Sequence, residues 1–292
     1  MKFIITLLVF FCFGVNANST EKLKIFISVD MEGIGGVGSP EMTSRIGKDY
    51  ALGRELMTKE VNTVVAAIFL QGEAEILIND SHGDHQNLHH TKLDPRVSYI
   101  QGHRKLLGMV EGLDDSFDGV IFIGFHARAG TEGGFLAHTG SNEVKGLWLN
   151  GIEVGEGGLN AAFAGSLGVP VLMASGDKKF AEEFKARTNI MTVVTKEAIT
   201  ANAAKLVHPK VVRGRLSKGV KDALENISKA STFIIAKTKV NVRLKVATTI
   251  RADVLMSVPN MKRVDGFTVE YDAKNMDEAY KLIRMMYKFI VP

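Results

Sequence analysis

Two acidic residues, Asp30 and Glu32, directly follow an apolar run that reads as a β-strand. They lie in the stretch SVDMEGIGGVGSP, and the residues KIFIS before it are mostly apolar. Residues i and i+2 at the end of a strand point to the same side, so the two carboxylates can converge on one point. Taken alone, the pair could also be a solvated acidic turn. Further ligand residues at the same place would indicate a cation site.

Histidines follow two other predicted strands at the corresponding place. ILINDSHGDH carries Asp80 and His82, and VIFIGFHARAG carries His126. A single histidine is more often a hydrogen-bonded core or surface residue, but three strand ends of this kind favour a metal centre. Imidazole and carboxylate are the ligands of Zn²⁺ or Mn²⁺ when no thiolate is present. In an open α/β sheet, the carboxyl edge is also where ligands bind.

The remaining histidines carry weaker signals. His138 lies in the glycine-rich stretch FLAHTG, and its position alone makes it a candidate catalytic residue. Surface or structural places are expected for His85, His89, His90, His103 and His208, of which His85 is near enough to support the site.

The glycines after the acidic pair spell a different motif, G-x-G-x-x-G, at Gly33, Gly35 and Gly38. That motif binds dinucleotides when it joins a strand directly to a helix, whose N-terminus receives the phosphates. Here Ser-Pro follows, no helical periodicity starts before about Ile46, and the carboxylates would face a polyanion. We therefore predict a loop that binds cations, with glycines that let the backbone turn tightly.

Short apolar runs without alternation recur along the chain, as expected for strands buried on both faces. An apolar helical stripe from Leu52 to Ile68 separates the first two runs, and Phe180–Ala204 reads as further helix. This alternation predicts an α/β fold with a mainly parallel sheet flanked by helices. The predicted strands are Lys24–Val29, Glu75–Ile78, Val120–Phe125 and Val169–Ala174.

The second half of the chain has other local signals. Asn150-Gly151 favours a type I′ hairpin turn, and a helix is expected to begin near Glu156. TKVNVRLKVATTIRADVLMSV is predicted to form a pair of strands, and GFTVEYD another. NMDEAYKLIRMMYKFI is an amphipathic helix in which Asn275 and Glu278 have capping-box spacing. We expect a smaller C-terminal α+β portion packed beside the main sheet.

The first residues are typical of a secretory signal peptide. Lys2 gives a positive start, an apolar run extends from Phe3 to Val15, and the residues up to Ala17 resemble a cleavage site. An uncleaved anchor is the alternative, but about 13 apolar residues are too few to span a bilayer. We predict an exported protein, periplasmic or secreted, that keeps no stable membrane anchor after cleavage.

Cysteine usage and charge exclude several kinds of chemistry. The one cysteine, Cys12, lies in the predicted signal peptide, so the mature chain would have no disulfide, zinc-thiolate site or cysteine nucleophile. The formal net charge is only +4, and no basic run with interleaved aromatic residues indicates nucleic acid. The predicted parts are 1–17, the signal peptide; 18–205, the α/β metal-binding catalytic domain; and 206–292, the smaller α+β portion.

Five separated motifs, SVDMEG, NDSHG, GFHA, AHTG and NGIEVGEGGLNAA, together resemble the D-aminopeptidase family of di-zinc metallopeptidases. The resemblance extends over about Lys24 to Ser175, and the C-terminal α+β portion is similar to that family's as well. It implies two zinc ions per subunit and a homo-oligomer, in this family a ring. It also implies that Asp30 bridges the ions, with Glu32 and His126 at one site, His82 and Glu156 at the other, and His138 as the catalytic histidine.

The motifs and the resemblance together imply a function. We expect an exported metallo-aminopeptidase that removes an N-terminal residue, D-Ala or another small D-residue, from short peptides. His138 would act as a proton shuttle, an oxyanion donor or a nucleophile. A metal-dependent amidase or phosphoesterase on the same two-metal centre is the alternative enzyme. A non-catalytic metal- or ligand-binding protein is the alternative outside enzymes.

Overall fold

The computed structural model describes residues 22–186, 188, 190–236 and 238–290. The predicted signal peptide, 1–17, lies outside these residues. No helix within the described ranges has both the length and the apolar character that crossing a membrane requires.

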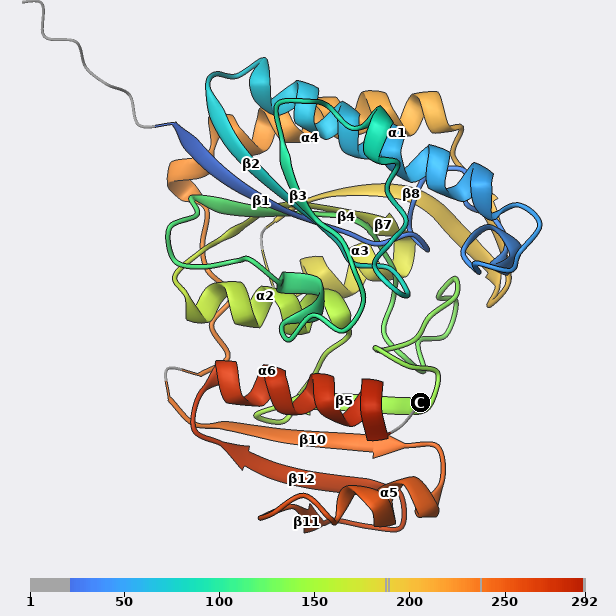
Figure 1. Ribbon diagram of the computed structural model, residues 1–292, viewed down its shortest axis with the longest axis vertical. Coiled ribbons are helices and arrows are strands. Elements are labelled where there is room, and N and C mark those ends of the chain that lie inside the picture. Colours follow the sequence, from blue (N-terminus) through green and yellow to red (C-terminus); the bar gives the residue numbers. More distant parts are fainter. Residues whose placement is uncertain (1–21, 187, 189, 237, 291–292) are drawn as a thin grey trace, which may run out of the picture.

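A seven-stranded sheet forms the larger layer of the molecule (Figure 1). Its spatial order is β3-β2-β1-β4-β7-β8-β9, and all neighbours are parallel except the last pair. The mainly parallel α/β fold predicted from the sequence is confirmed. The strands are β1 (Leu23–Val29), β2 (Ala74–Asp80), β3 (Ser98–Ile100), β4 (Gly119–Phe125), β7 (Val171–Asp177), β8 (Met191–Thr200) and β9 (Ala203–Leu206).

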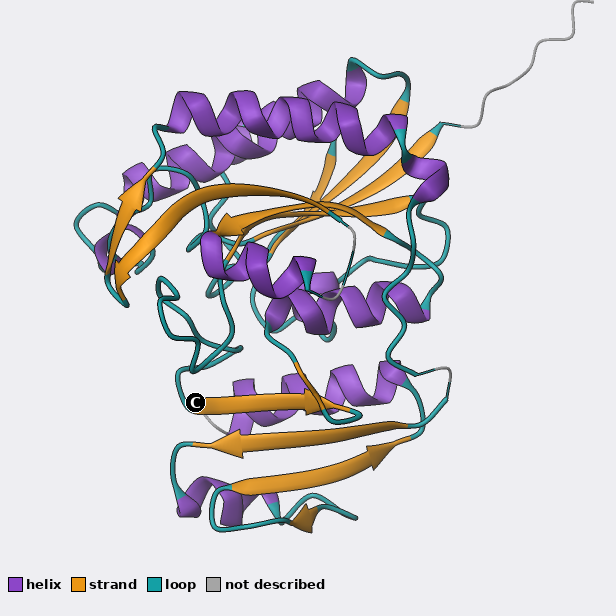
Figure 2. Cartoon of the chain, turned by 180° about the vertical axis from the view of Figure 1, so that it is seen from behind, coloured by secondary structure: helices purple, strands orange, loops and turns teal. Residues whose placement is uncertain are grey.

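Helices cover both faces of this sheet. Helices α1 (Tyr50–Phe69) and α4 (Pro209–Glu225) pack side by side on one face, and α2 (Glu156–Ser166) and α3 (Lys178–Lys185) lie on the other (Figures 1 and 2). Strands β4 and β7 are buried along their whole length and β1 from Ile25 to Val29, so their residues are mostly apolar without alternation. Short 3₁₀ segments in the connections are η1 (Pro40–Met42), η2 (His90–Lys92), η3 (Gly108–Val110) and η4 (Ile227–Lys229).

A second, antiparallel sheet forms the smaller layer, in the order β11-β12-β10-β5-β6. Helix α6 (Met276–Met285) continues as a π-helical segment, η5 (Met286–Ile290), and lies between this sheet and α2 (Figure 1). The buried Tyr280 of α6 donates a hydrogen bond to Asn160 of α2 at 2.7 Å and so joins the layers. The other elements are β5 (Val144–Leu149), β6 (Ile152–Glu153), β10 (Val240–Val246), α5 (Thr249–Leu255), β11 (Lys262–Arg263) and β12 (Thr268–Ala273).

The structure contradicts two local predictions. The helix predicted over Phe180–Ala204 ends at Lys185, and β8 follows. The β8 residues TVVT are β-branched and favour a strand. In the predicted strand pair after Lys239, only the first member, β10, is a strand. The second is helix α5, which the Thr248 hydroxyl caps by accepting a hydrogen bond from the Arg251 amide.

Neither layer is formed by one continuous segment of the chain. Strands β5 and β6 belong to the second sheet although they precede residue 205, and α4 packs on the first sheet although it follows that residue. The hairpin between β5 and β6 turns at Asn150 and Gly151, both with positive φ, as a type I′ turn requires. The chain thus enters the second layer once before α2 and again after α4.

Candidate metal centre

The ends of three neighbouring strands bring Asp30, His82 and His126 to one edge of the large sheet. Val29, the last residue of β1, pairs with the last residue of β2 and with a residue near the end of β4. The three predicted ligands therefore follow aligned strand ends, as the sequence indicates. Asp30 and His126 are buried, and the His82 side chain is 11% exposed.

Asp30 lies between two groups of side chains. His82 Nδ1 is 3.2 Å from Asp30 Oδ1 and 2.9 Å from Glu32 Oε2. On the other side, His126 Nε2 is 3.4 Å from Asp30 Oδ2 and 3.4 Å from Glu156 Oε2. One aspartate thus shares its two oxygens between two histidine–glutamate pairs.

These contacts group the five residues differently from the resemblance. The resemblance pairs Glu32 with His126 and His82 with Glu156, whereas the shortest distances join His82 to Glu32 and His126 to Glu156. Ligand atoms of Asp30, Glu32 and His126 also lie within 4.8 Å of one another, so the two groups form one continuous cluster.

Main-chain carbonyls hold the three histidine rings of the cluster. In each ring, one nitrogen lies at hydrogen-bond distance from a carbonyl oxygen, which leaves the other nitrogen facing the carboxylates. The acceptors are Thr43 for His82 Nε2 (2.8 Å), Ala127 for His126 Nδ1 (2.9 Å) and Leu136 for His138 Nδ1 (2.9 Å). Such contacts fix the tautomer and the orientation of a metal-binding histidine.

Glu156, the first residue of α2, reaches the cluster from the side opposite His82. Its Oε1 accepts a hydrogen bond from the Gly140 amide at 2.5 Å and lies 3.6 Å from His138 Nε2. The His138 ring stacks on the His126 ring, with centroids 4.1 Å apart. The predicted catalytic histidine therefore borders the predicted ligands, and its ring is one-quarter exposed.

The charges of the buried groups depend on one another. Burial disfavours the charged form of His82 and of His126, but the neighbouring carboxylates outweigh it and hold the pKa of each well above its ordinary value. Burial also opposes ionisation of Glu156, yet His126 and His138 lower the pKa of Glu156 to about 2. Burial, with Glu32 second, raises the pKa of Asp30.

The donor set fits a divalent metal. Asp30 Oδ2 and His126 Nε2 are buried and have no hydrogen-bond partner among the described residues. Buried polar atoms are normally paired, so two unpaired atoms 3.4 Å apart leave a place for a cation. Carboxylate oxygens with imidazole nitrogens are a typical zinc ligand set.

The glycine-rich loop after β1, residues 33–38, is held in place by close packing and by a buried lysine. A side chain at Gly33 would place its Cβ 1.9 Å from the Phe125 carbonyl oxygen, so only glycine permits this approach of the loop after β1 to the end of β4. The Lys196 ammonium group on β8 is buried and donates hydrogen bonds to the main-chain oxygens of Glu32 and Val37. The sequence did not indicate this role, because Lys196 falls in the stretch that was predicted as helix.

Asp80 and His85 lie near the predicted ligands; Asp80 has a structural role, and His85 is buried instead of exposed. Asp80 accepts hydrogen bonds from the amides of Asn87 and Leu88 and so holds the loop that follows His82. His85 is 2% exposed, although a surface place was predicted for it, and its Nδ1 has no partner among the described residues.

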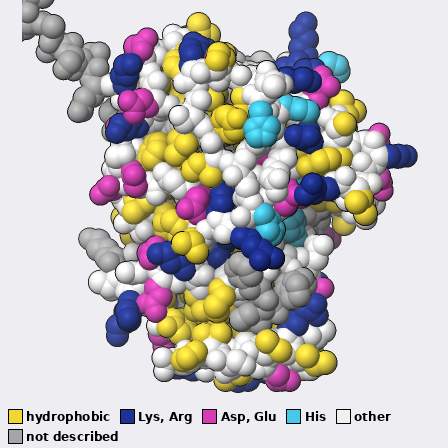
Figure 3. All heavy atoms as spheres, in the orientation of Figure 1, with side chains coloured by type: hydrophobic (Ala, Val, Ile, Leu, Met, Phe, Trp, Pro, Cys, Tyr) yellow, Lys and Arg dark blue, Asp and Glu magenta, His cyan; other side chains and the backbone are white. Residues whose placement is uncertain are grey.

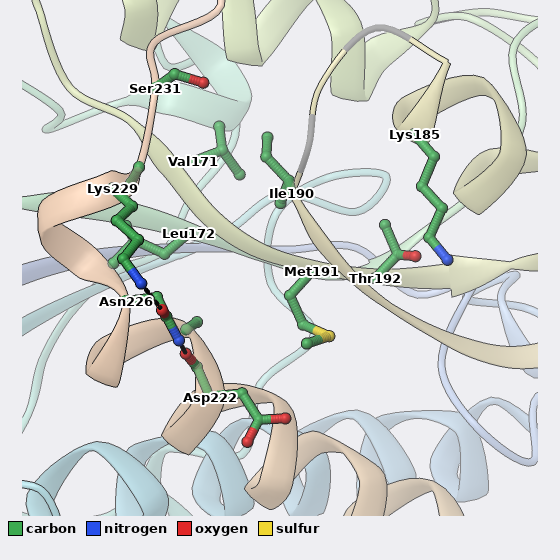
Figure 4. A pocket seen from close by; sticks show the side chains of 12 residues that line it. Val171, Leu172, Lys185, Ile190, Met191, Thr192, Asp222, Asn226, Lys229 and Ser231 are labelled. Atoms are coloured by element: carbon green, nitrogen blue, oxygen red, sulfur yellow. Dashed lines mark hydrogen bonds between the residues drawn. The ribbon is translucent and has the colours of Figure 1, made fainter.

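A pocket of about 90 Å³ opens onto this cluster, lined by Asp30, His82, His138 and Glu156 among others. A larger pocket, of about 580 Å³, lies elsewhere (Figure 4). It is formed by the first residues of β7 and β8 with the last turn of α4, at the amino edge of the sheet. None of the predicted site residues lines it.

Comparisons with known proteins identify the family of this chain. The family model described as D-aminopeptidase, of peptidase family M55, matches residues 23–285. The D-aminopeptidase of Bacillus subtilis (strain 168) is 36% identical over 266 residues, which are 90% of this chain and 96% of that protein. A solved structure, the Zn-dependent D-aminopeptidase DppA from Bacillus subtilis, described as a self-compartmentalizing protease, superposes with a TM-score of 0.89 at 36% identity. That alignment covers 92% of this chain and 98% of DppA. The chain therefore belongs to the D-aminopeptidase family and is a hydrolase of that class.

Proposed function

We propose that this protein is a zinc-dependent aminopeptidase that removes a small N-terminal D-residue, such as D-Ala, from short peptides. The observation that carries the proposal is the placement of Asp30 between two histidine–glutamate pairs at the carboxyl edge of the sheet. The family and the solved relative support the zinc dependence and the D-specificity.

The geometry supports one set of ligands. Asp30, Glu32, His82, His126 and Glu156 would hold two zinc ions, with Asp30 in contact with both histidines. Zinc held there would supply Lewis-acid chemistry, which activates water and polarises a carbonyl group. The protein itself holds the five ligand side chains in place. Four of them, Asp30, Glu32, His126 and Glu156, are buried, so bulk water has little access to them.

His138 is the residue proposed to move protons. Its Nδ1 lies at hydrogen-bond distance from the Leu136 oxygen, so Nε2, which is 3.6 Å from Glu156 Oε1, is the atom that would accept or donate a proton toward the pocket. Its partial exposure lets it exchange protons with solvent, which the buried ring of His126 cannot do as readily. We assign it acid–base or oxyanion-donor work.

The proposal includes export and assembly. The signal-peptide pattern of residues 1–17 supports export to the periplasm or the medium, where peptides with D-residues from cell walls would be available. The self-compartmentalizing relative supports a homo-oligomer with enclosed sites. Expression of the full chain, with N-terminal sequencing and light scattering, tests both points. A monomer, or a chain that keeps residues 1–17 inside the cell, would contradict them.

The decisive assay uses D-Ala-p-nitroanilide and L-Ala-p-nitroanilide, with and without a chelator. We expect hydrolysis of the D-compound only, its loss with chelator and its return with Zn²⁺. Equal rates on both compounds would remove the stereospecific part of the proposal. Activity that survives complete metal removal would remove the metal-dependent part.

A further inference from the structure

A second pocket adjoins the one that opens onto the metal centre. Its volume is about 70 Å³, and it shares Gly83, His85, Arg284 and Lys288 with the first pocket. His103 and Arg104 complete its lining, so every side chain that lines it carries nitrogen and none is acidic. One end of the combined space is thus formed by carboxylates and the other by cationic or imidazole groups.

Arg284 of α6 is the buried charge in this second pocket. It is only 4% exposed, and its Nε has no hydrogen-bond partner among the described residues. Its other nitrogens donate to the Tyr287 hydroxyl at 3.1 Å and to the Lys105 carbonyl at 3.2 Å. In the described part of the chain, no carboxylate forms an ion pair with it. A buried guanidinium without a counter-ion is costly, so an anion from outside would stabilise it.

The guanidinium group of Arg284 packs directly against the backbone of η3. A side chain at Gly108 would place its Cβ 2.3 Å from Arg284 Nε, so the bare backbone of η3 makes room for the group. Gly108 itself has φ +49°, a conformation that favours glycine. Arg284, on α6 of the smaller layer, therefore packs its guanidinium group against η3 of the larger layer.

Lys288 reinforces the same pocket. It follows Arg284 by four residues, which places both side chains on one face of the helical segment. It is half-buried, and none of the hydrogen bonds or ion pairs of the described residues involves it. On the face shown in Figure 3, histidine and basic side chains gather near the junction of the two layers.

We propose that Arg284 and Lys288 bind the C-terminal carboxylate of a dipeptide substrate. The inference rests on the proposed aminopeptidase function. The substrate's scissile carbonyl would lie at the end lined by Asp30 and Glu156, where the zinc ions are proposed to bind, and its carboxylate at the cationic end. The first pocket has room for about three water molecules and the second for about two, which suits a small group and not an extended chain. Arginine can hold a carboxylate with two parallel hydrogen bonds.

The test compares D-alanyl-D-alanine with D-alanyl-D-alaninamide, which lacks only the negative charge. In the unaltered enzyme, kcat/KM for the acid exceeds that for the amide by about tenfold or more, mainly through KM. Lys288→Gln lowers kcat/KM for the acid by a similar factor and leaves the amide unchanged, and Lys288→Arg restores the preference. Lys281→Gln, on the exposed face of the same helix, changes neither substrate.

Arg284→Gln should remove the preference for the acid completely. Lys288→Gln decides the matter if Arg284→Gln does not fold, as judged by circular dichroism. An unaltered enzyme that cleaves acid and amide equally overturns the carboxylate site but leaves the aminopeptidase function intact. Equal losses on both substrates in Lys288→Gln also overturn the site. An unaltered enzyme that cleaves neither compound refutes the proposed function and the site with it.

Discussion

The Lys196 ammonium group donates a hydrogen bond to the main-chain oxygen of Glu32, the predicted ligand that lies 164 residues earlier in the chain. A second bond goes to the oxygen of Val37 at 2.7 Å, so one buried lysine spans the glycine loop. The backbone of the loop that carries Glu32 is thus held by β8, a strand that contributes none of the predicted ligands.

Replacing this lysine should loosen the loop. Lys196→Met leaves two buried carbonyl oxygens unpaired, and we expect a loss of about 1–3 kcal/mol in the free energy of unfolding. Zinc affinity should fall as well, because Glu32 is no longer held. Urea unfolding and metal analysis measure the two effects. Lys205→Met, exposed on neighbouring β9, is the matched control, and equal behaviour of the two variants would contradict the role of Lys196.

Removal of a predicted ligand should cost metal and activity together. His82→Ala takes away the imidazole that faces Asp30 and Glu32, so we expect the loss of one zinc equivalent and of nearly all hydrolysis. Circular dichroism should remain unchanged. His90→Ala, at an exposed position, serves as control. Full zinc content and full activity in His82→Ala would refute the two-metal assignment.

The His138→Ala variant should separate catalysis from metal binding. The ring borders Glu156 but is not among the shortest contacts of Asp30, so both zinc equivalents should remain. The kcat should fall by about 10²–10⁴, the usual range for loss of a general acid or base. Metal analysis and steady-state kinetics check this. Loss of a zinc ion would identify His138 as a ligand instead.

Glu60 predicts a pH dependence of stability. It is buried, and its Oε1 accepts a hydrogen bond from the Gly35 amide at 2.8 Å. Burial raises the pKa of Glu60 to about 7, above the ordinary value of 4.5. Between pH 4.5 and about 7, Glu60 is therefore protonated in the folded protein but ionised in the unfolded chain. This contribution to stability is fully present below pH 4.5 and is lost as the pH rises through about 7.

Urea unfolding of the metal-free protein from pH 4.5 to 7.5 measures this slope. Other buried groups, among them His85, whose pKa burial lowers, also change the stability with pH in the same range, so the effect of Glu60 is read as a difference from Glu60→Gln. Relative to that variant, we expect the free energy of unfolding of the unaltered protein to fall by about 1–3 kcal/mol over the range, since the amide cannot ionise but still accepts from Gly35. Glu55→Gln, exposed on the same helix, should behave like the unaltered protein. Equal slopes in the unaltered protein and in Glu60→Gln would contradict the role of Glu60.

The sequence predicts the part of the site that depends on parallel strand ends. Asp30, His82 and His126 each follow a recognisable apolar run, and aligned runs end at one edge of a sheet. Glu156 has no such signal, because it opens a helix after a hairpin, and only the resemblance implied its role. The α/β class was predictable for the same reason as the strand ends, since buried parallel strands are apolar without alternation.

The contributions from distant elements were not predictable from local patterns. Lys196 lies in a strand that was read as a helix, and a lysine is normally taken as exposed. Arg284 resembles any polar residue of an amphipathic helix, yet it is buried against η3. Both depend on contacts between residues more than 150 positions apart, which periodicity within a short window does not report.

Because α6 lies near the C-terminus of the chain, the surface of α2 that it covers stays exposed until late in synthesis. Helix α2 begins with Glu156, and its outer face is covered by α6, where Phe163 meets Tyr280 at 5.0 Å between ring centroids. A ribosome makes α6 after every other described α-helix. A nascent chain that already carries all five predicted ligands therefore still exposes one side of α2. Such a chain acquires a finished peptidase site only when α6 has been made and has docked.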